Sequence, residues 1–231
     1  MDTIISNIAV IIVAYFIGAF PQLILLARLH HVEPVGDLHH ALWRKAGPAW
    51  GLFASAIDVF KGIGTVLLVR ALGFDAPVVV FAALAATCGQ MWPVFKNFDG
   101  EKGNTTGFGA ALTLAFWPAL ICLTPVILAI ISKAVKALQL KNVPKDQRFR
   151  TGAGQSNALP LGVAAAFLLL PFLAAIFDEP AAVVIGFAAL FVLVVIRRLT
   201  AGLPADLATD APRLKIFWSR LLLDRPIKGE A

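Results

Sequence analysis

The sequence predicts an all-α polytopic membrane protein of about seven transmembrane helices, one short or broken, with a C-terminal interfacial helix. Of its 231 residues, 59% are hydrophobic and 15% are charged, and the mean hydropathy is +0.81. Several apolar runs reach the roughly 20 residues that a bilayer-spanning helix needs. The basic residues concentrate in a few loops and the tail, as membrane topology requires. We therefore expect contact with a lipid bilayer and no nucleic-acid partner.

The apolar runs place most of the membrane helices. The first run covers residues 4–29 and is interrupted by Gly18, Pro21 and Gln22, so we expect a bend near its end. It lacks a basic leader and a small-residue cleavage site, which indicates a retained helix rather than a signal peptide. Further spans are expected at 51–71, 76–94, 158–177 and 180–196.

The apolar stretch from residue 105 to 138 is too long for one crossing. As a straight helix it would be about 50 Å long, whereas the hydrocarbon core is roughly 30 Å thick. Trp117-Pro118 predicts a break between a short helix at 104–116 and a full one at 118–138. Seven crossings then place every basic loop and the C-terminus in the cytoplasm and the N-terminus outside.

The chain divides into a membrane domain at 1–202 and a cytoplasmic amphipathic tail at 203–231. In the tail, one helical stripe carries apolar residues and a tryptophan while basic residues lie elsewhere, which is typical of an interfacial helix. The residues of this stripe are Leu214, Phe217, Trp218, Leu221 and Leu222. A basic segment at 141–157 is expected to be an insertion. The only two cysteines, Cys88 and Cys122, lie in apolar runs and indicate buried thiols.

A polar segment at 89–109, GQMWPVFKNFDGEKGNTTGFG, interrupts the apolar sequence after the third span. Gly100 and Gly103 flank Lys102, and glycine lets backbone N–H groups turn toward a ligand. Backbone donors beside a lysine form an anion site, most often for phosphate. The alternative is a tight cytoplasmic turn with solvated charges.

The second span carries polar residues inside an apolar helix. Spacings of three and four put Ser55, Asp58, Gly62 and Thr65 on one face, with Lys61 one turn from Asp58. Charges in membrane helices usually face the bundle interior. The Asp58–Lys61 pair has two interpretations, a structural ion pair or part of a site.

Three motifs together carry a resemblance to a known family: YFIGAFP at 15–21, DVFKG at 58–62 and the polar segment at 89–109. In this order and spacing they resemble the acyl-phosphate-dependent glycerol-3-phosphate acyltransferases, the PlsY family. Its patterns read roughly Y-x-x-G-S-x-P, D-x-x-K-G and G-H-x-F-P-V-F-x-x-F-x-G-G-K-G-x-A-T. RRLTAG at 197–202 is similar to the closing R-L-x-x-G of that family. The resemblance covers most of 4–202.

The resemblance implies an enzyme of phospholipid biosynthesis in a bacterial plasma membrane. It would move a fatty acyl group from acyl phosphate to the 1-hydroxyl of glycerol 3-phosphate, giving lysophosphatidic acid and phosphate, without a metal or other cofactor. Because acyl phosphate is already activated, the protein mainly holds two phosphorylated substrates together and balances their charge. The resemblance leaves open whether the protein works with a partner enzyme that makes the acyl phosphate. The implied substrate- and phosphate-binding residues are Arg44, Lys102, Gly100, Gly103, Thr106, Asp58 and Lys61.

The chain departs from the family pattern near the expected chemistry. The sequence DLHHA at 37–41 replaces a cradle of glycine, serine and asparagine, and Gln90 replaces a histidine. Glu101 stands where the family has a second glycine, and Val195 where it has an asparagine. A glutamine can donate a hydrogen bond but cannot accept a proton near neutral pH.

Two functional interpretations follow, with catalytic candidates His39, His40 and Gln90. In the first, a divergent acyltransferase, His39 or His40 serves the reacting hydroxyl, or the substrate phosphate itself acts as the base. In the second, a paralogue keeps the fold, binds phosphate or lipid and has lost the transfer. The broken helices alone suggest a third, a transporter. The sequence retains all four charged residues of the expected site, Arg44, Asp58, Lys61 and Lys102, and this favours the acyltransferase.

Overall fold

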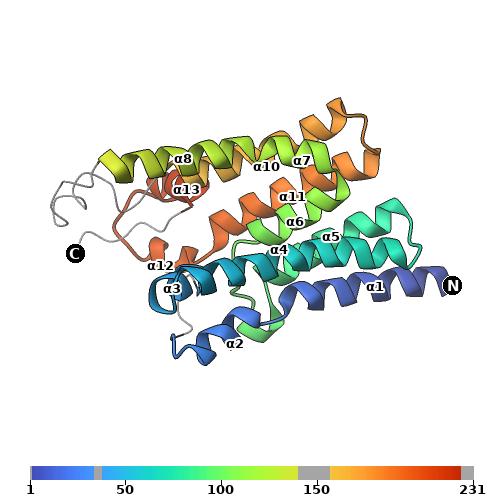
Figure 1. The fold of residues 1–231 in the computed structure, drawn as a ribbon, viewed down its shortest axis with the longest axis horizontal. Coiled ribbons are helices and arrows are strands. Elements are labelled where there is room, and N and C mark those ends of the chain that lie inside the picture. Colours follow the sequence, from blue (N-terminus) through green and yellow to red (C-terminus); the bar gives the residue numbers. More distant parts are fainter. Residues whose placement is uncertain (1, 34–37, 140–156, 225–231) are drawn as a thin grey trace.

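The computed structural model describes residues 2–33, 38–139 and 157–224 as a bundle of helices whose long members run along one axis (Figure 1). The long or spanning elements are α1 (Asp2–Ala19), α4 (Pro48–Ala71), α5 (Ala76–Met91), α6 (Asn104–Leu114), α7 (Phe116–Cys122), α8 (Thr124–Gln139), α10 (Ala158–Ile176) and α11 (Ala181–Thr200). Short helices lie at one end of the bundle: α2 (Gln22–Leu29), α3 (Leu38–Lys45), α12 (Leu203–Leu207) and α13 (Arg213–Leu223). The predicted all-helical membrane fold is confirmed.

The first apolar run is split where the sequence predicted a bend. Phe20 and Pro21 separate α1 from α2, and Gln22 opens the second helix. Proline has no backbone N–H and therefore cannot continue the hydrogen-bond ladder of α1. The break exposes the carbonyl groups at the end of α1 to side chains from other helices.

The long apolar stretch is also split, but earlier than predicted. Helix α6 ends at Leu114 and α7 begins at Phe116, with Ala115 in extended conformation between them. Trp117-Pro118 does not form the break, because Pro118 lies in the first turn of α7, where no intrahelical N–H bond is required. A second discontinuity, at Leu123, separates α7 from α8.

Within the described residues, six helical segments are long and apolar enough to cross a membrane: Thr3–Leu29, Pro48–Ala71, Ala76–Lys96, Phe116–Lys136, Ala158–Ile176 and Ala181–Thr200. Helix α6 is shorter, at 11 residues. In Figure 1 it runs back toward the end of the bundle where α1 begins, and α7 and α8 return in the opposite direction. The seventh crossing therefore stays a prediction.

Glycines bring helix backbones into close contact. A Cβ built at Gly62 of α4 would lie 2.1 Å from the Thr106 carbonyl oxygen of α6, and one at Gly109 of α6 would lie 2.1 Å from the Val59 carbonyl oxygen. Such distances leave no room for a side chain. The tight α4–α6 contact places the start of α6 against the polar face of α4, where the site is formed.

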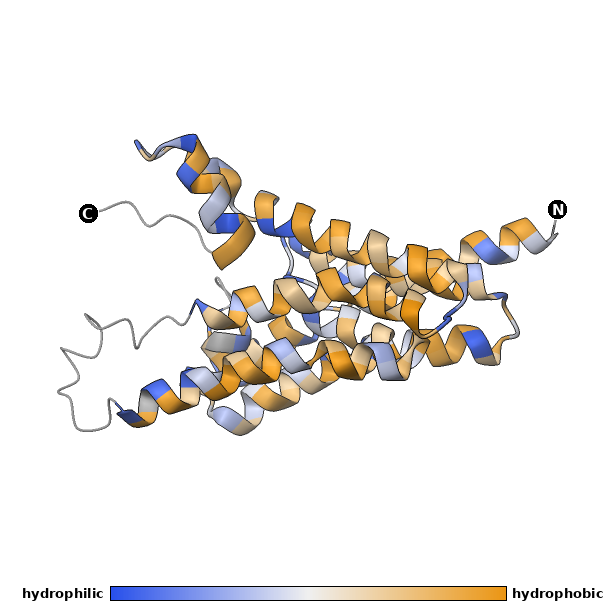
Figure 2. Ribbon diagram, turned by 90° about the horizontal axis from the view of Figure 1, so that it is seen from above, coloured by the Kyte–Doolittle hydropathy of each residue, from blue (hydrophilic) through white to orange (hydrophobic). Residues whose placement is uncertain are grey.

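The surface is that of a membrane protein. The ribbons of the long helices are mostly apolar along their length, with polar residues near their ends (Figure 2). In α13, Ile216 and Arg220 are buried against the bundle, while Leu214, Phe217 and Trp218 are exposed. This exposed apolar face agrees with the predicted interfacial helix.

Candidate functional site

The candidate site lies at the C-terminal end of α5, where the chain leaves the helix at Pro93 and continues as a loop. The Tyr15 hydroxyl donates to the Trp92 carbonyl at 2.7 Å and accepts from the Val94 N–H at 3.1 Å. The loop then folds back, and the N–H groups of Gly100 and Glu101 donate to the last carbonyls of α5. Irregular backbone at a membrane protein's interior must be satisfied within the protein. Tyr15 thus stabilises the break that the loop requires.

Arg197, near the end of α11, holds the other side of this loop. Its guanidinium donates to Asp99 Oδ1 at 2.9 Å, to the Glu101 carbonyl at 3.1 Å and to the Gly100 carbonyl. Only 7% of the Arg197 side chain is exposed. A buried guanidinium with several carbonyl partners fixes a loop strongly, because removing it leaves each acceptor unpaired.

Asp58 is the centre of the buried polar cluster. Its Oδ1 accepts from Gln22 Nε2 and lies 3.4 Å from Lys61 Nζ, and its Oδ2 lies 3.0 Å from His39 Nε2. The carboxylate is fully buried, and polar nitrogens from α2, α3 and α4 lie close to its oxygens. The cluster joins the two halves of the broken first run to α4.

Lys61 also caps α1. Its ammonium donates to the carbonyls of Gly18 at 3.1 Å and Phe20 at 2.9 Å. A cation at the C-terminal end of a helix satisfies unpaired carbonyls and interacts favourably with the helix dipole. Together with Asp58, these partners occupy all three donors of Lys61, so the structural interpretation of the pair has direct support.

His39 has a partner at each ring nitrogen. Its Nε2 faces Asp58, and its Nδ1 lies 3.3 Å from Ser55 Oγ; the single hydroxyl proton of Ser55 can go either to Nδ1 or to the Gly51 carbonyl, which lies at 3.1 Å. The carboxylate requires a donor, so the proton of a neutral imidazole belongs on Nε2 and Nδ1 is an acceptor. The side chain of His40, the other predicted histidine, lies outside the described part of the chain.

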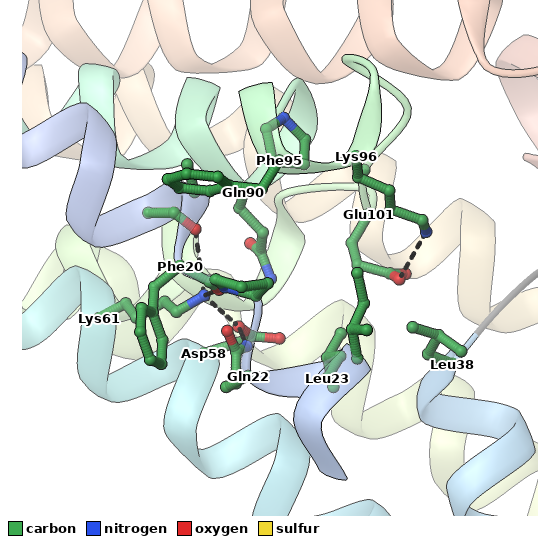
Figure 3. A pocket seen from close by; sticks show the side chains of 16 residues that line it. Phe20, Gln22, Leu23, Leu38, Asp58, Lys61, Gln90, Phe95, Lys96 and Glu101 are labelled. Carbon is green, nitrogen blue, oxygen red and sulfur yellow. Dashed lines mark hydrogen bonds and ion pairs between the residues drawn. The ribbon is translucent and has the colours of Figure 1, made fainter. Parts of the chain in front are cut away.

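A pocket adjoins this cluster (Figure 3), with about 370 Å³ of space between the atoms when the solvent at its open mouth is counted. Its polar lining comes from four segments, the α1–α2 break, α4, the end of α5 and the loop after Pro93. Lys96 lies 3.8 Å from Glu101 on its wall, and Gln90 donates to Thr105 Oγ1 at 3.2 Å. The full lining is Gly18, Ala19, Phe20, Pro21, Gln22, Leu23, Ile24, Leu38, Asp58, Lys61, Gln90, Pro93, Phe95, Lys96, Gly100 and Glu101.

The two predicted phosphate-facing cations lie outside this lining, at the same end of the bundle. Lys102 is 46% exposed, and its Nζ lies 2.7 Å from Asp224 Oδ2 at the end of α13. Arg44 is exposed on α3, and its guanidinium forms no ion pair or hydrogen bond within the described residues. The structure therefore shows Lys102 with a carboxylate as partner and Arg44 exposed on the surface of α3.

Other predicted residues hold the loop in shape. Gly103 has a left-handed conformation, with φ of 74°, directly before the first residue of α6. A Cβ at Gly100 would lie 2.2 Å from the Gln90 carbonyl oxygen. Thr106 Oγ1 donates to the Asp58 backbone carbonyl at 2.9 Å, which fixes α6 on α4.

The sequence did not reveal four residues of the site. Tyr15 and Arg197 stand in motifs that carried the resemblance, but their partners lie 77 to 98 residues away. Gln22 was noticed only as an interruption of a span, and Asp224 was not singled out. A polar residue beside a proline break was the one signal that pointed to Gln22.

The fold and site define a class, the polytopic helical membrane proteins with a polar pocket at one end of the bundle. A family model described as Glycerol-3-phosphate acyltransferase matches residues 8–202. The chain therefore belongs to the glycerol-3-phosphate acyltransferase family, which is a family of enzymes of phospholipid biosynthesis, and it is an integral membrane protein.

Relatives and solved structures agree with this assignment. The chain is 28% identical to Glycerol-3-phosphate acyltransferase 4 of Dehalococcoides mccartyi strain CBDB1, covering 94% of this chain and 88% of that protein. It is 36% identical over 47% of its length to the glycerol-3-phosphate acyltransferase of Rubrobacter xylanophilus, covering 57% of that protein. Crystal structures of PlsY, an integral membrane glycerol 3-phosphate acyltransferase, match with a TM-score of 0.64 at 22% identity. They cover 84% of this chain and 88% of PlsY and show a shared fold.

Proposed function

We propose that this protein transfers a fatty acyl group from acyl phosphate to glycerol 3-phosphate, forming lysophosphatidic acid and phosphate. Family membership supports the class of reaction. One of the similar PlsY structures is described as the glycerol 3-phosphate form and another as the lysophosphatidic acid form, which supports the acceptor and the product. The acyl phosphate donor rests on the motifs of the polar segment, which resemble the family that uses it.

The observation that carries the proposal is the contact between His39 and Asp58. The family histidine is replaced by Gln90 here, and an amide cannot accept a proton. His39, from a different helix, supplies an imidazole with Nε2 oriented by the Asp58 carboxylate. The chain thus retains an acid–base group beside the pocket, which favours transfer over a paralogue that only binds.

In the proposed reaction, His39 Nδ1 takes the proton of the 1-hydroxyl of glycerol 3-phosphate. The oxygen attacks the acyl carbon, the bond from that carbon to the phosphate oxygen breaks, and the phosphate leaves and takes up the proton. Arg44 and Lys102 balance the negative charge of the two phosphate groups. The loop that carries Lys102 is held in shape by Gly100, Gly103 and Thr106. Asp58 orients His39, and Lys61 pairs with Asp58 and caps α1.

The bundle end that carries α2, α3 and α13 is proposed to face the cytoplasm of a bacterium. In Figure 1 this end also holds the last turn of α11, which carries Arg197 and Arg198, and α3 itself carries Arg44 and Lys45. The acidic connection at Asp178-Glu179 lies at the other end, together with the start of α1. The positive-inside rule then gives an external N-terminus and a cytoplasmic C-terminus in the plasma membrane. A cytoplasmic enzyme that makes acyl phosphate could supply the donor.

The proposal is tested with the purified full chain in detergent, palmitoyl phosphate and glycerol 3-phosphate. Lysophosphatidic acid and phosphate are expected to appear in equal amounts. His39→Ala should reduce kcat by about 100-fold, the order of a lost general base. His30→Ala is the control, because His30 packs on Trp50 at a ring-centroid distance of 4.1 Å and is not among the residues that line the pocket. No product from the wild-type chain with any acyl length would favour the binding paralogue.

A further inference from the structure

The pocket beside Asp58 contains two buried amide oxygens. Gln22 and Gln90 are 6% and 5% exposed, and both line the pocket (Figure 3). No hydrogen-bond donor of the described residues reaches the Oε1 atom of either side chain. A buried acceptor without a donor is unfavourable, so these oxygens require a hydrogen-bond donor from a ligand or from water.

The orientation of the Gln22 amide is fixed by its partner. Its Nε2 donates to Asp58 Oδ1, and a carboxylate accepts hydrogen bonds without donating them. Oε1 is therefore the amide atom that does not contact Asp58, and it is a buried neutral acceptor on a side chain that lines the pocket. Gln90 uses its own Nε2 on Thr105 Oγ1, at 3.2 Å.

The charges of the pocket are already balanced. Lys61 is paired with Asp58, and Lys96 is paired with Glu101. A phosphate dianion would find no unpaired cation among the lining residues. The pocket is therefore suited to the neutral part of a substrate that donates hydrogen bonds, whereas the exposed cations outside it suit the phosphate.

We propose that Gln22 Oε1 accepts a hydrogen bond from the spectator hydroxyl of the acceptor substrate and thereby selects polyol phosphates. This inference rests on the proposed function. The reacting hydroxyl must lose its proton to a base, which an amide cannot be. The spectator hydroxyl of glycerol 3-phosphate keeps its proton throughout the transfer and can donate it in a hydrogen bond, for which the Gln22 amide oxygen is an acceptor.

The test compares two acceptors, glycerol 3-phosphate and propane-1,3-diol monophosphate, which lacks the spectator hydroxyl. With palmitoyl phosphate as donor, the wild-type chain should prefer glycerol 3-phosphate by roughly 10- to 100-fold in kcat/KM. Gln22→Met also removes the hydrogen bond to Asp58 and should lower kcat/KM for both acceptors, but it should lower the value for glycerol 3-phosphate further and so bring the ratio to within about threefold of one. A ratio is independent of the fraction of active enzyme, and a merely structural role for Gln22 would lower both values together.

Leu23→Val is the matched control, since Leu23 lines the same pocket without a polar group, and the ratio should stay at the wild-type value. If Gln22→Met is inactive, Gln22→Asn is measured instead. Asparagine keeps the amide but is shorter by one methylene, so the preference for glycerol 3-phosphate in kcat/KM should fall. Equal use of both acceptors by the wild-type chain, or an unchanged ratio in the Gln22 variants, would overturn the inference and assign the oxygens to water. A wild-type chain that makes no lysophosphatidic acid would instead overturn the proposed function, and this inference with it.

Discussion

Lys102 and Arg44 are the two side chains assigned to substrate phosphate, and they can be tested singly. Lys102→Ala and Arg44→Ala should each lower kcat/KM by about 100-fold or more, because each removes a cation that stabilises developing negative charge. The measurement is lysophosphatidic acid formation at varied glycerol 3-phosphate. Lys133→Ala, which removes an exposed cation from α8, serves as the control. Full activity in the Lys102 variant would remove this residue from the site.

Asp224 competes with substrate for Lys102 in this account. Its carboxylate lies 2.7 Å from the Lys102 ammonium, in a partly exposed pair whose strength is modest. Asp224→Asn should therefore lower KM for glycerol 3-phosphate by about two- to fivefold. Asp210→Asn makes the same charge change elsewhere in the tail and should leave KM unaltered. A higher KM in the Asp224 variant would mean that the tail orders Lys102 for binding rather than competing with substrate.

Single residues of the site were predictable only where their chemistry is visible in the chain itself. A buried aspartate and lysine three residues apart on an apolar helix predicted a polar cluster, and Asp58 and Lys61 do meet at 3.4 Å. The partner Gln22 lies 36 residues away, and Arg197 reaches the loop over 98 residues. Such contacts depend on how helices pack, which spacing within one helix cannot reveal.

At the scale of elements, the contact between α4 and α6 depends on Gly62. Gly62→Ala would force a methyl group against the α6 backbone and should destabilise the protein by about 1–3 kcal/mol. The measurement is the thermal unfolding midpoint in detergent. Gly64→Ala, on the same helix, is the matched control, because a Cβ there meets no atom within 4 Å. Equal midpoints for the two variants would show that α4 and α6 do not approach this closely.

Whole helices were easier to predict than the points where they break. The apolar runs predicted each of the long spans that the structure describes, because the length of an apolar run can be read locally in the sequence. The bend near Pro21 was predicted, but the break at Ala115 was placed at Trp117-Pro118, because a proline at the start of a helix resembles one that ends it. Helix α12, with five residues, was too short to predict.

At the scale of the whole molecule, the topology can be tested by labelling single cysteines with a membrane-impermeant maleimide in intact cells. In a background without Cys88 and Cys122, both Asp75→Cys and Glu179→Cys should be labelled from outside. Asp210→Cys should react only after the cells are permeabilised. Seven crossings put the first two residues on the same face, because α6 crosses between them. Labelling of only one of the two from outside would show that α6 does not cross.

The central claim is that this membrane bundle catalyses transfer of an acyl group between two phosphorylated molecules. The most direct measurement is a ³¹P NMR time course of the purified protein with palmitoyl phosphate and glycerol 3-phosphate. We predict that both substrate signals decay together and that lysophosphatidic acid and inorganic phosphate rise in equal amounts. Loss of palmitoyl phosphate without lysophosphatidic acid, or no change in any signal, would contradict the account.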